Sequence, residues 1–178
     1  MGNHQNGRMR VSTPIGRLPA SVVIAGNALF WPVWTAAVGY AAQRTPDTRF
    51  AEDDVLTRQR GFERAGAWYR DSLAIDRWKT RLPEAGSAFG GFAKRTVAGG
   101  DPDVMEQFVV ETRRAEHAHW GMLAGAALTL LWNPWWAAPA NVAVGVGSNL
   151  PCIAVQRYNR ARLARALAAV RRRATSSR

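Results

Sequence analysis

The sequence predicts an all-α integral membrane protein with about three membrane segments. These are one N-terminal anchor and one C-terminal helical hairpin, with amphipathic interfacial helices between them. Of the 178 residues, 24 are Lys or Arg and 13 are Asp or Glu, so the net charge is +11. All 13 acidic residues lie between Asp47 and Glu116, and both acid-free ends contain long uncharged runs. Basic residues that flank apolar sequence are typical of membrane spans and argue against a soluble nucleic-acid-binding domain.

The pattern divides the chain into a basic N-terminus with the first membrane segment (1–43), a cytoplasmic-face region (44–119), a membrane hairpin (120–156) and an Arg-rich tail (157–178). Residues 18–43 carry no charge over 26 positions, and about 20 apolar residues suffice for a helix to cross a bilayer. The apolar core of a signal peptide is usually about 7–15 residues, so this run favours a retained anchor over a cleaved signal. Within it, Trp31, Trp34 and Tyr40 are expected towards an interface.

The second uncharged run covers residues 120–156, which is 37 residues. This length is too great for one span and slightly short for two. Asn133-Pro134 and Pro139 lie near its middle and are typical of a turn. The run therefore predicts a tight helical hairpin, made of two short spans or of a re-entrant loop.

The tail carries no acidic residue and contains Arg157, Arg160, Arg162, Arg165, Arg171, Arg172 and Arg173. The positive-inside rule therefore places the C-terminus in the cytoplasm. A hairpin returns the chain to its starting side, so the 44–119 region is expected there too. The N-terminus would then lie outside, against the charge of Arg8, Arg10 and Arg17.

The central region alternates aromatic and basic residues over 60–86. Trp68, Ile75 and Leu82 recur at seven-residue intervals, which predicts one apolar face of an amphipathic helix. Such a helix could lie in the headgroup layer, with arginines on phosphates. The same face could also bind an amphiphilic substrate.

The glycine-rich residues 86–103 predict a loop, with Asp101 or Asp103 opening the next helix. We expect this helix to run from about Pro102 into the membrane. It contains the segment ETRRAEHAHW, residues 111–120, which holds the candidate catalytic groups.

Thr112, Glu116 and His119 are spaced four and three residues apart, so they share one helical face. The chain turns apolar at Trp120, which places the imidazole at the membrane surface. This spacing suits general base catalysis, in which neutral His119 takes a proton from a hydroxyl while Glu116 orients the ring. The alternative is a charged helix end that anchors at the interface, with no catalytic role for the histidine.

Other kinds of site find little support. A di-iron site built on Glu-x-x-His needs a second copy of the motif, but the chain has only His4, His117 and His119, with no acid after Glu116. The single cysteine, Cys152, lies in an apolar run without a basic neighbour, which favours a packing role over a nucleophile.

The hairpin ends in the polar block Gln156, Arg157, Tyr158, Asn159 and Arg160. One interpretation is an anchor whose arginines contact anionic lipid head groups. Tyr158 and Asn159 add hydrogen-bonding groups that anchoring does not require, which favours contacts with a substrate as the second interpretation.

Three blocks carry a resemblance to a known family. They are Phe62-Glu63-Arg64-x-Gly66 with Trp78-Lys79, the ETRRAE-x-x-HW of 111–120, and the N-L-P-x-I-x-V-QRYNR-x-RL of 149–163. Together they resemble the glycosyl-4,4'-diaponeurosporenoate acyltransferases, small membrane enzymes of carotenoid biosynthesis. The resemblance covers roughly residues 46–167 and implies esterification of a sugar hydroxyl on a glycosylated carotenoid with a fatty acyl group.

By position, the resemblance extends to Glu111, Arg114, Glu116, His119, Trp120, Gln156, Arg157, Tyr158, Asn159, Arg160 and Arg162. We predict that His119 is the base and that Glu116 orients it. Arg114, Arg157 and Arg160 are expected to bind the anionic part of the acyl donor or to stabilise the oxyanion. The other predicted substrate-binding residues are Glu111, Gln156, Tyr158, Asn159, Trp78 and Lys79.

The predicted partners are a lipid-soluble glycosylated carotenoid or glycolipid acceptor, a fatty acyl donor and anionic membrane lipids. No cofactor and no nucleic acid are expected; the donor, an acyl-coenzyme A, acyl carrier protein or lipid, acts as co-substrate. The resemblance implies a multi-pass protein of the bacterial cell membrane. Two other classes stay open: a small membrane methyltransferase acting on isoprenoid or lipid ends, and a non-catalytic adaptor of pigment enzymes.

Overall fold

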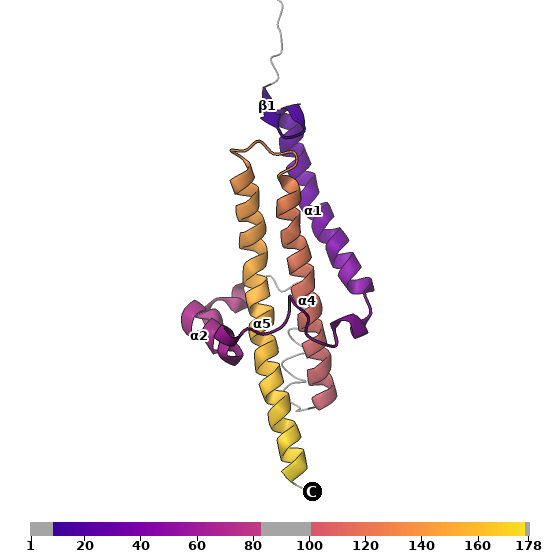
Figure 1. Ribbon diagram of the computed structural model, residues 1–178, viewed down its shortest axis with the longest axis vertical. Helices are drawn as coiled ribbons and strands as arrows, with labels where there is room; N and C mark the ends of the chain where they lie inside the picture. The colour runs from indigo at the N-terminus through magenta and orange to yellow at the C-terminus, as the bar shows by residue number, and fades with distance from the viewer. Residues whose placement is uncertain (1–8, 83–100, 177–178) are drawn as a thin grey trace, which may run out of the picture.

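Three long helices dominate the computed structural model, which describes residues 9–82 and 101–176 (Figure 1). They are α1 (Ala20–Arg44), α4 (Pro102–Thr129) and α5 (Ala138–Ser176). Helices α4 and α5 pack along each other as an antiparallel pair, and α1 packs against α4. The pair is joined by residues 130–137, which include Asn133-Pro134. The predicted helical class is confirmed.

Short elements fill the remaining described chain. An antiparallel pair of strands, β1 (Arg10–Thr13) and β2 (Gly16–Pro19), precedes α1. Between α1 and α4 lie η1 (Asp47–Phe50), η2 (Gly61–Gly66), α2 (Ala67–Leu73), η3 (Ile75–Arg77) and η4 (Lys79–Arg81). The strands lie at the same end as the α4–α5 turn, while α2 packs beside the middle of α5 (Figure 1).

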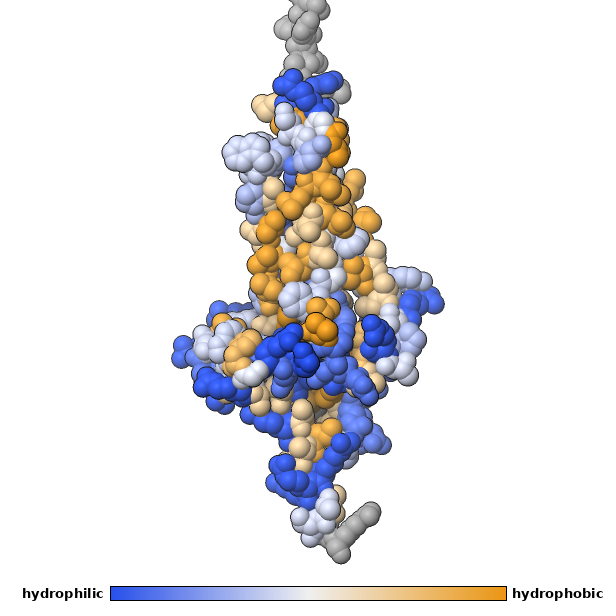
Figure 2. Space-filling model, viewed as in Figure 1, coloured by the Kyte–Doolittle hydropathy of each residue, from blue (hydrophilic) through white to orange (hydrophobic). Residues whose placement is uncertain are grey.

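The apolar surface supports a membrane location. Helices α1 and α5 are both long and apolar enough to cross a bilayer. Their apolar side chains point outwards, and Ile24, Leu29 and Val33 of α1 are 69%, 67% and 66% exposed. Figure 2 shows this apolar surface over the half of the molecule that holds the α4–α5 turn, with hydrophilic residues over the other half. The exposure of so many apolar side chains is unfavourable in water and favourable in lipid.

The third predicted segment is the apolar end of α4. Residues 120–129 are helical and uncharged, and ten helical residues span only about 15 Å. The structure therefore gives two full-length candidate spans, and a third membrane segment stays a prediction. The tail predicted for 157–178 is no separate element, because α5 continues from the apolar run through Ser176 without a break.

Small residues let α1 approach the α4–α5 pair. A Cβ at Gly125 would lie 2.5 Å from the Trp34 ring, and one at Gly145 would lie 3.0 Å from the Trp31 ring. Both indoles therefore fill the helix–helix interface, which corrects the expectation that they lie towards the membrane boundary. Tyr40 is 63% exposed at the other end of α1.

A cluster of amides fastens the α4–α5 turn to α1. Asn133 is 1% exposed, and its oxygen accepts from Asn27 (2.7 Å) and Asn141 (3.2 Å). Its nitrogen donates to the side-chain oxygen of Asn27 (2.9 Å) and to the carbonyl of Thr129 (2.8 Å). All four hydrogen-bonding positions of this amide are therefore used, as a polar group in an apolar half requires.

The amphipathic helix predicted over 60–86 is wrong as far as the described residues reach. The segment up to Leu82 is a series of short turns, because Arg64, Ala65 and Ala74 adopt positive φ angles of 45°, 52° and 46°. A left-handed residue ends a right-handed helix.

The three residues of the predicted apolar face nevertheless gather against α5. Ile75 is fully buried beside Val155 and Tyr158, and Trp68 and Leu82 pack against the same cluster. The seven-residue spacing correctly predicted that these three side chains share one apolar surface. It wrongly predicted a continuous helix between them.

The loop predicted for 86–103 lies outside the described residues up to position 100. The start of α4 is described, and the side chain of Asp101 accepts a hydrogen bond from the Asp103 amide at 3.0 Å. With Pro102 at the first helical position, Asp101 is the helix N-cap, one of the two residues predicted to open the helix.

Candidate active site

His119 and Asn149 face each other across α4 and α5. The Nδ1 atom of His119 lies 3.0 Å from the side-chain oxygen of Asn149. The amide of Asn149 is oriented because its nitrogen donates to the Gly145 carbonyl at 2.9 Å. An amide oxygen only accepts, so Nδ1 carries the proton and Nε2 of the neutral ring keeps its lone pair. The arrangement prepares Nε2 to act as a base.

Glu116 does not orient His119, which corrects the sequence prediction. One of its oxygens accepts from Nη1 of Arg157 at 2.6 Å and from the Trp120 indole at 3.3 Å. The other accepts from Nη2 of Arg160 at 2.6 Å. The carboxylate is completely buried, and the guanidinium groups of α5 attract it away from the imidazole one turn along α4. The orienting residue is Asn149, which lies in the third resemblance block and which the spacing along α4 does not single out.

Arg157 is a structural clamp, and its predicted contact with an anion stays a prediction that this geometry does not support. Its five N–H groups donate to the Tyr69 hydroxyl (3.1 Å), the carboxylates of Glu116 (2.6 Å) and Glu63 (2.5 Å), and the carbonyls of Leu56 (2.7 Å) and Arg58 (2.8 Å). A guanidinium has five donors in all. Arg157 therefore has no donor left for a substrate.

Arg160 keeps donors that protein groups do not use. Its Nη2 donates to Glu116 and to the Thr57 carbonyl, both at 2.6 Å. Among the described residues, Nε and Nη1 have no hydrogen-bond partner, although the side chain is only 3% exposed. Nε forms a long ion pair with a carboxylate oxygen of Asp53, 3.9 Å away. Of the three arginines predicted to bind an anion, Arg160 is the one with buried nitrogen atoms that have no partner among the described residues.

The buried ion network consists of Glu63, Glu116, Arg157 and Arg160, and its formal charges cancel. Both carboxylates are 0% exposed and both guanidinium groups are below 10% exposed. Burial and the neighbouring Glu63 carboxylate raise the pKa of Tyr69 to about 12, so its phenol stays neutral against Arg157. Removing one member of such a network leaves an unpaired buried charge, which is strongly destabilising.

The segment between η1 and η2 supplies the carbonyls that the arginines bind. A side-chain oxygen of Asp54 accepts from the amides of Leu56 (2.9 Å) and Thr57 (3.0 Å), which closes a local turn. Its other oxygen lies 2.7 Å from Nε2 of His117. Burial would raise the pKa of Asp54, but the hydrogen bonds from His117 and Thr57 outweigh it and hold that pKa well below its usual range.

Arg114 also has a structural role, and its predicted contact with the acyl donor stays a prediction that these bonds do not support. Nη1 donates to the carbonyls of Ala42 and Thr45, both at 2.6 Å, and Nη2 bonds to Asp47. Nε is paired with Glu111 at 3.3 Å. The side chain thereby caps the C-terminal end of α1, where helix carbonyls lack partners.

The remaining predicted binding residues fasten the 67–82 segment to α5. The Tyr158 hydroxyl donates to Asp76 at 2.9 Å, and Lys79 pairs with Asp76 at 2.7 Å. Lys79 also lies over the Tyr158 ring, and the Trp78 indole donates to a carbonyl of α2 at 2.8 Å. Gln156 and Asn159 are half-buried on α5, and their contacts with a substrate stay a prediction.

Comparisons with known proteins agree on one family. The model of the glycosyl-4,4'-diaponeurosporenoate acyltransferase family matches residues 52–169. A protein of that name from Staphylococcus aureus strain USA300 is 25% identical over 149 residues, which is 82% of this chain and 88% of the relative. One from Staphylococcus haemolyticus is 28% identical over 138 residues, covering 77% and 80%. No solved structure is similar to the chain. The matched region contains all four members of the ion network and both His119 and Asn149.

Proposed function

Because this chain belongs to the glycosyl-4,4'-diaponeurosporenoate acyltransferase family, we propose that it esterifies a sugar hydroxyl of a glycosylated carotenoid or similar glycolipid with a fatty acyl group. The observation that carries the proposal is the His119–Asn149 pair. In this pair the imidazole ring of His119, the candidate base, is held in one orientation. It lies where the sequence of α4 changes from charged to apolar.

The reaction needs a proton acceptor. Nε2 of His119 takes the proton of the acceptor hydroxyl while the oxygen attacks the acyl carbonyl of the donor. Asn149 holds Nδ1–H throughout, which keeps the lone pair on Nε2 and then stabilises the imidazolium. When the tetrahedral intermediate collapses, the imidazolium returns the proton to the leaving group of the donor. The products are the ester and the protonated leaving group.

Charge develops on the carbonyl oxygen during this attack. The free Nε and Nη1 donors of Arg160 are the group best suited to an oxyanion or to an anionic part of the donor. Asp53 lies beside them, so a ligand at this position has to displace that carboxylate from Arg160.

The membrane supplies both apolar substrates. The outward apolar surfaces of α1 and α5 support a multi-pass protein that meets its acceptor and its fatty acyl chain within the bilayer. The arginines at the end of α5, among which there is no acidic residue, support a cytoplasmic C-terminus through the positive-inside rule.

Mass spectrometry of lipid extracts tests the function directly. A strain that lacks this protein should accumulate an unacylated glycoside, and expression of the unmodified chain should convert that glycoside to its fatty acyl ester. A product that gains a methyl group instead would favour the methyltransferase alternative. Full acylation in the absence of the chain would contradict the proposal.

A further inference from the structure

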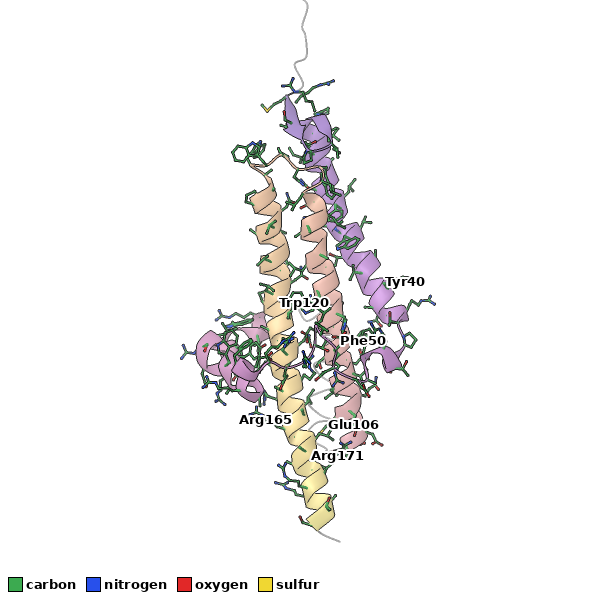
Figure 3. All side chains as sticks on the ribbon, viewed as in Figure 1. Tyr40, Phe50, Glu106, Trp120, Arg165 and Arg171 are labelled. Atoms are coloured by element: carbon green, nitrogen blue, oxygen red, sulfur yellow. The ribbon has the colours of Figure 1, made fainter. Side chains whose placement is uncertain are left out.

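A pocket of about 360 Å³ opens beside the ion network. Its walls are Val55, Leu56, Arg60, Phe62, Glu63, Trp120 and Arg157. The volume falls in the range of about 300–1,000 Å³ that is usual for small-ligand sites. Trp120 follows His119 in α4 and lies about halfway along the α4–α5 pair (Figure 3). One pocket wall, Trp120, therefore comes from the same turn of α4 as the proposed base, His119.

Glu63 gives this pocket an unused acceptor. One of its oxygens accepts from Arg157 at 2.5 Å and from the backbone amide of Arg60 at 2.9 Å. The other, Oε2, is buried and has no partner at hydrogen-bonding geometry among the described residues, and the Tyr69 hydroxyl is the protein donor beside this carboxylate. A buried oxygen without a donor is costly, so a ligand that supplies an O–H or N–H gains that energy on binding.

The remaining walls favour a neutral ring with hydroxyl groups. The faces of Trp120 and Phe62 offer apolar area, and Glu63 offers an acceptor at the same pocket. An anion would be repelled by Oε2 and would find no free donor on Arg157. The cation of the walls that could attract one is Arg60, whose side chain is exposed and bonds through Nη2 to the Val55 carbonyl at 2.7 Å. An acyl chain would leave Oε2 without a partner.

We propose that the pocket of Glu63, Phe62 and Trp120 binds the glycosyl group of the acceptor, with a sugar hydroxyl donating to Oε2 of Glu63. This inference rests on the proposed function, since it places that acceptor's sugar next to His119. The apolar face of the sugar packs on the aromatic walls, while the apolar tail of the acceptor stays in the bilayer. Glu63 is then a substrate-binding residue.

A binding experiment tests the pocket without any acyl transfer. The full chain is labelled with 5-fluorotryptophan, reconstituted in lipid nanodiscs and titrated with octyl β-D-glucopyranoside below its micelle concentration. The signal of Trp120, assigned with Trp120→Phe, is followed by fluorine NMR. Octanol, which has the same tail without a sugar, is the control ligand. The glycoside should shift the Trp120 signal with saturation, and octanol should not.

Three variants locate the contact. Glu63→Gln replaces the free acceptor by a donor and should weaken binding at least tenfold. Phe62→Ala removes a pocket wall whose ring packs against Trp68 and leaves all four charged side chains of the ion network in place. It should weaken binding severalfold even if Glu63→Gln fails to fold. Glu106→Gln, far from the pocket near the start of α4 (Figure 3), should bind as the unmodified chain does.

The two proposals fail in different ways. Equal shifts with glycoside and octanol, or unchanged binding by Phe62→Ala, would overturn the pocket. Glycoside binding that depends on these residues, in a chain that forms no ester in lipid extracts, would keep the pocket and overturn the acyl transfer.

Discussion

Asn149 accepts a hydrogen bond from Nδ1 of His119 across the α4–α5 pair, at 3.0 Å. The two residues are 30 positions apart in the chain, and the bond selects the tautomer in which Nε2 is free. The catalytic proposal therefore depends on how α4 and α5 pack, and not on neighbours within α4.

The first prediction concerns Asn149 as a positioning residue. Asn149→Ala should lower the turnover number at least about tenfold, because the ring loses the acceptor that fixes its tautomer. Asn149→Asp keeps an acceptor and adds a charge that favours the imidazolium. It should retain activity and move the acidic limb of the pH–rate profile to higher pH. A purely structural asparagine would leave that profile in place in both variants.

The second prediction concerns the ion network. Arg157→Lys cannot satisfy two carboxylates, a phenol and two carbonyls with three donors, so it should lower the free energy of unfolding by about 3 kcal/mol or more. Thermal unfolding in detergent measures the loss. Arg165→Lys, on the exposed side of the same helix, is the matched control and should be neutral. A stable Arg157→Lys protein that has lost only activity would restore the anion-binding role.

A third prediction tests the amide cluster at the α4–α5 turn. Asn133→Ala leaves partners on α1 and α5 without a hydrogen bond in the apolar half, so it should destabilise the protein by about 1–2 kcal/mol. Unfolding in nanodiscs reports this change. Gln43→Ala, which removes an exposed amide near the C-terminal end of α1, controls for the loss of an amide as such. An unaltered unfolding midpoint in Asn133→Ala would mean that the cluster adds no stability.

A fourth prediction concerns the pH dependence of the Asp54–His117 pair. Because the folded-state pKa of Asp54 is lowered, its stabilisation is fully present above the unfolded value of about 4 and is lost as the pH falls towards the folded value. The difference in unfolding midpoint between the unmodified chain and Asp54→Asn should therefore be smaller at pH 3 than at pH 5. A difference that does not change with pH would rule out the ionised carboxylate as its source.

The helices were predictable because lipid exposure leaves a strong local signal. The uncharged runs at 18–43 and 120–156 mark apolar surfaces that water does not tolerate, and Asn133-Pro134 marks the turn between α4 and α5. The 60–82 segment was not predictable in the same way. Its left-handed residues, Arg64, Ala65 and Ala74, belong to types that normally favour right-handed helix.

The contacts within the candidate site were also not predictable from local sequence. Spacing along α4 placed Glu116 and His119 on one helical face, with His119 at the border of the apolar run. It could not show that Arg157 and Arg160 of α5 bind the Glu116 carboxylate, or that Asn149 forms a hydrogen bond with the His119 imidazole. Those pairings depend on the register of two helices and on carbonyls of the 56–58 segment, which no local pattern specifies.

The measurement that most directly tests the account is the acyl-transfer rate of His119→Gln at matched protein abundance. Glutamine keeps a hydrogen-bonding group next to Asn149 but cannot accept the proton at neutral pH. General base catalysis contributes about 10²–10⁴-fold, so the account predicts a loss of at least about a hundredfold with normal membrane insertion. His117→Ala, which loses the contact with Asp54 and leaves His119 intact, should be far milder. Equal rates for His119→Gln and the unmodified chain would contradict the assignment of His119 as the base.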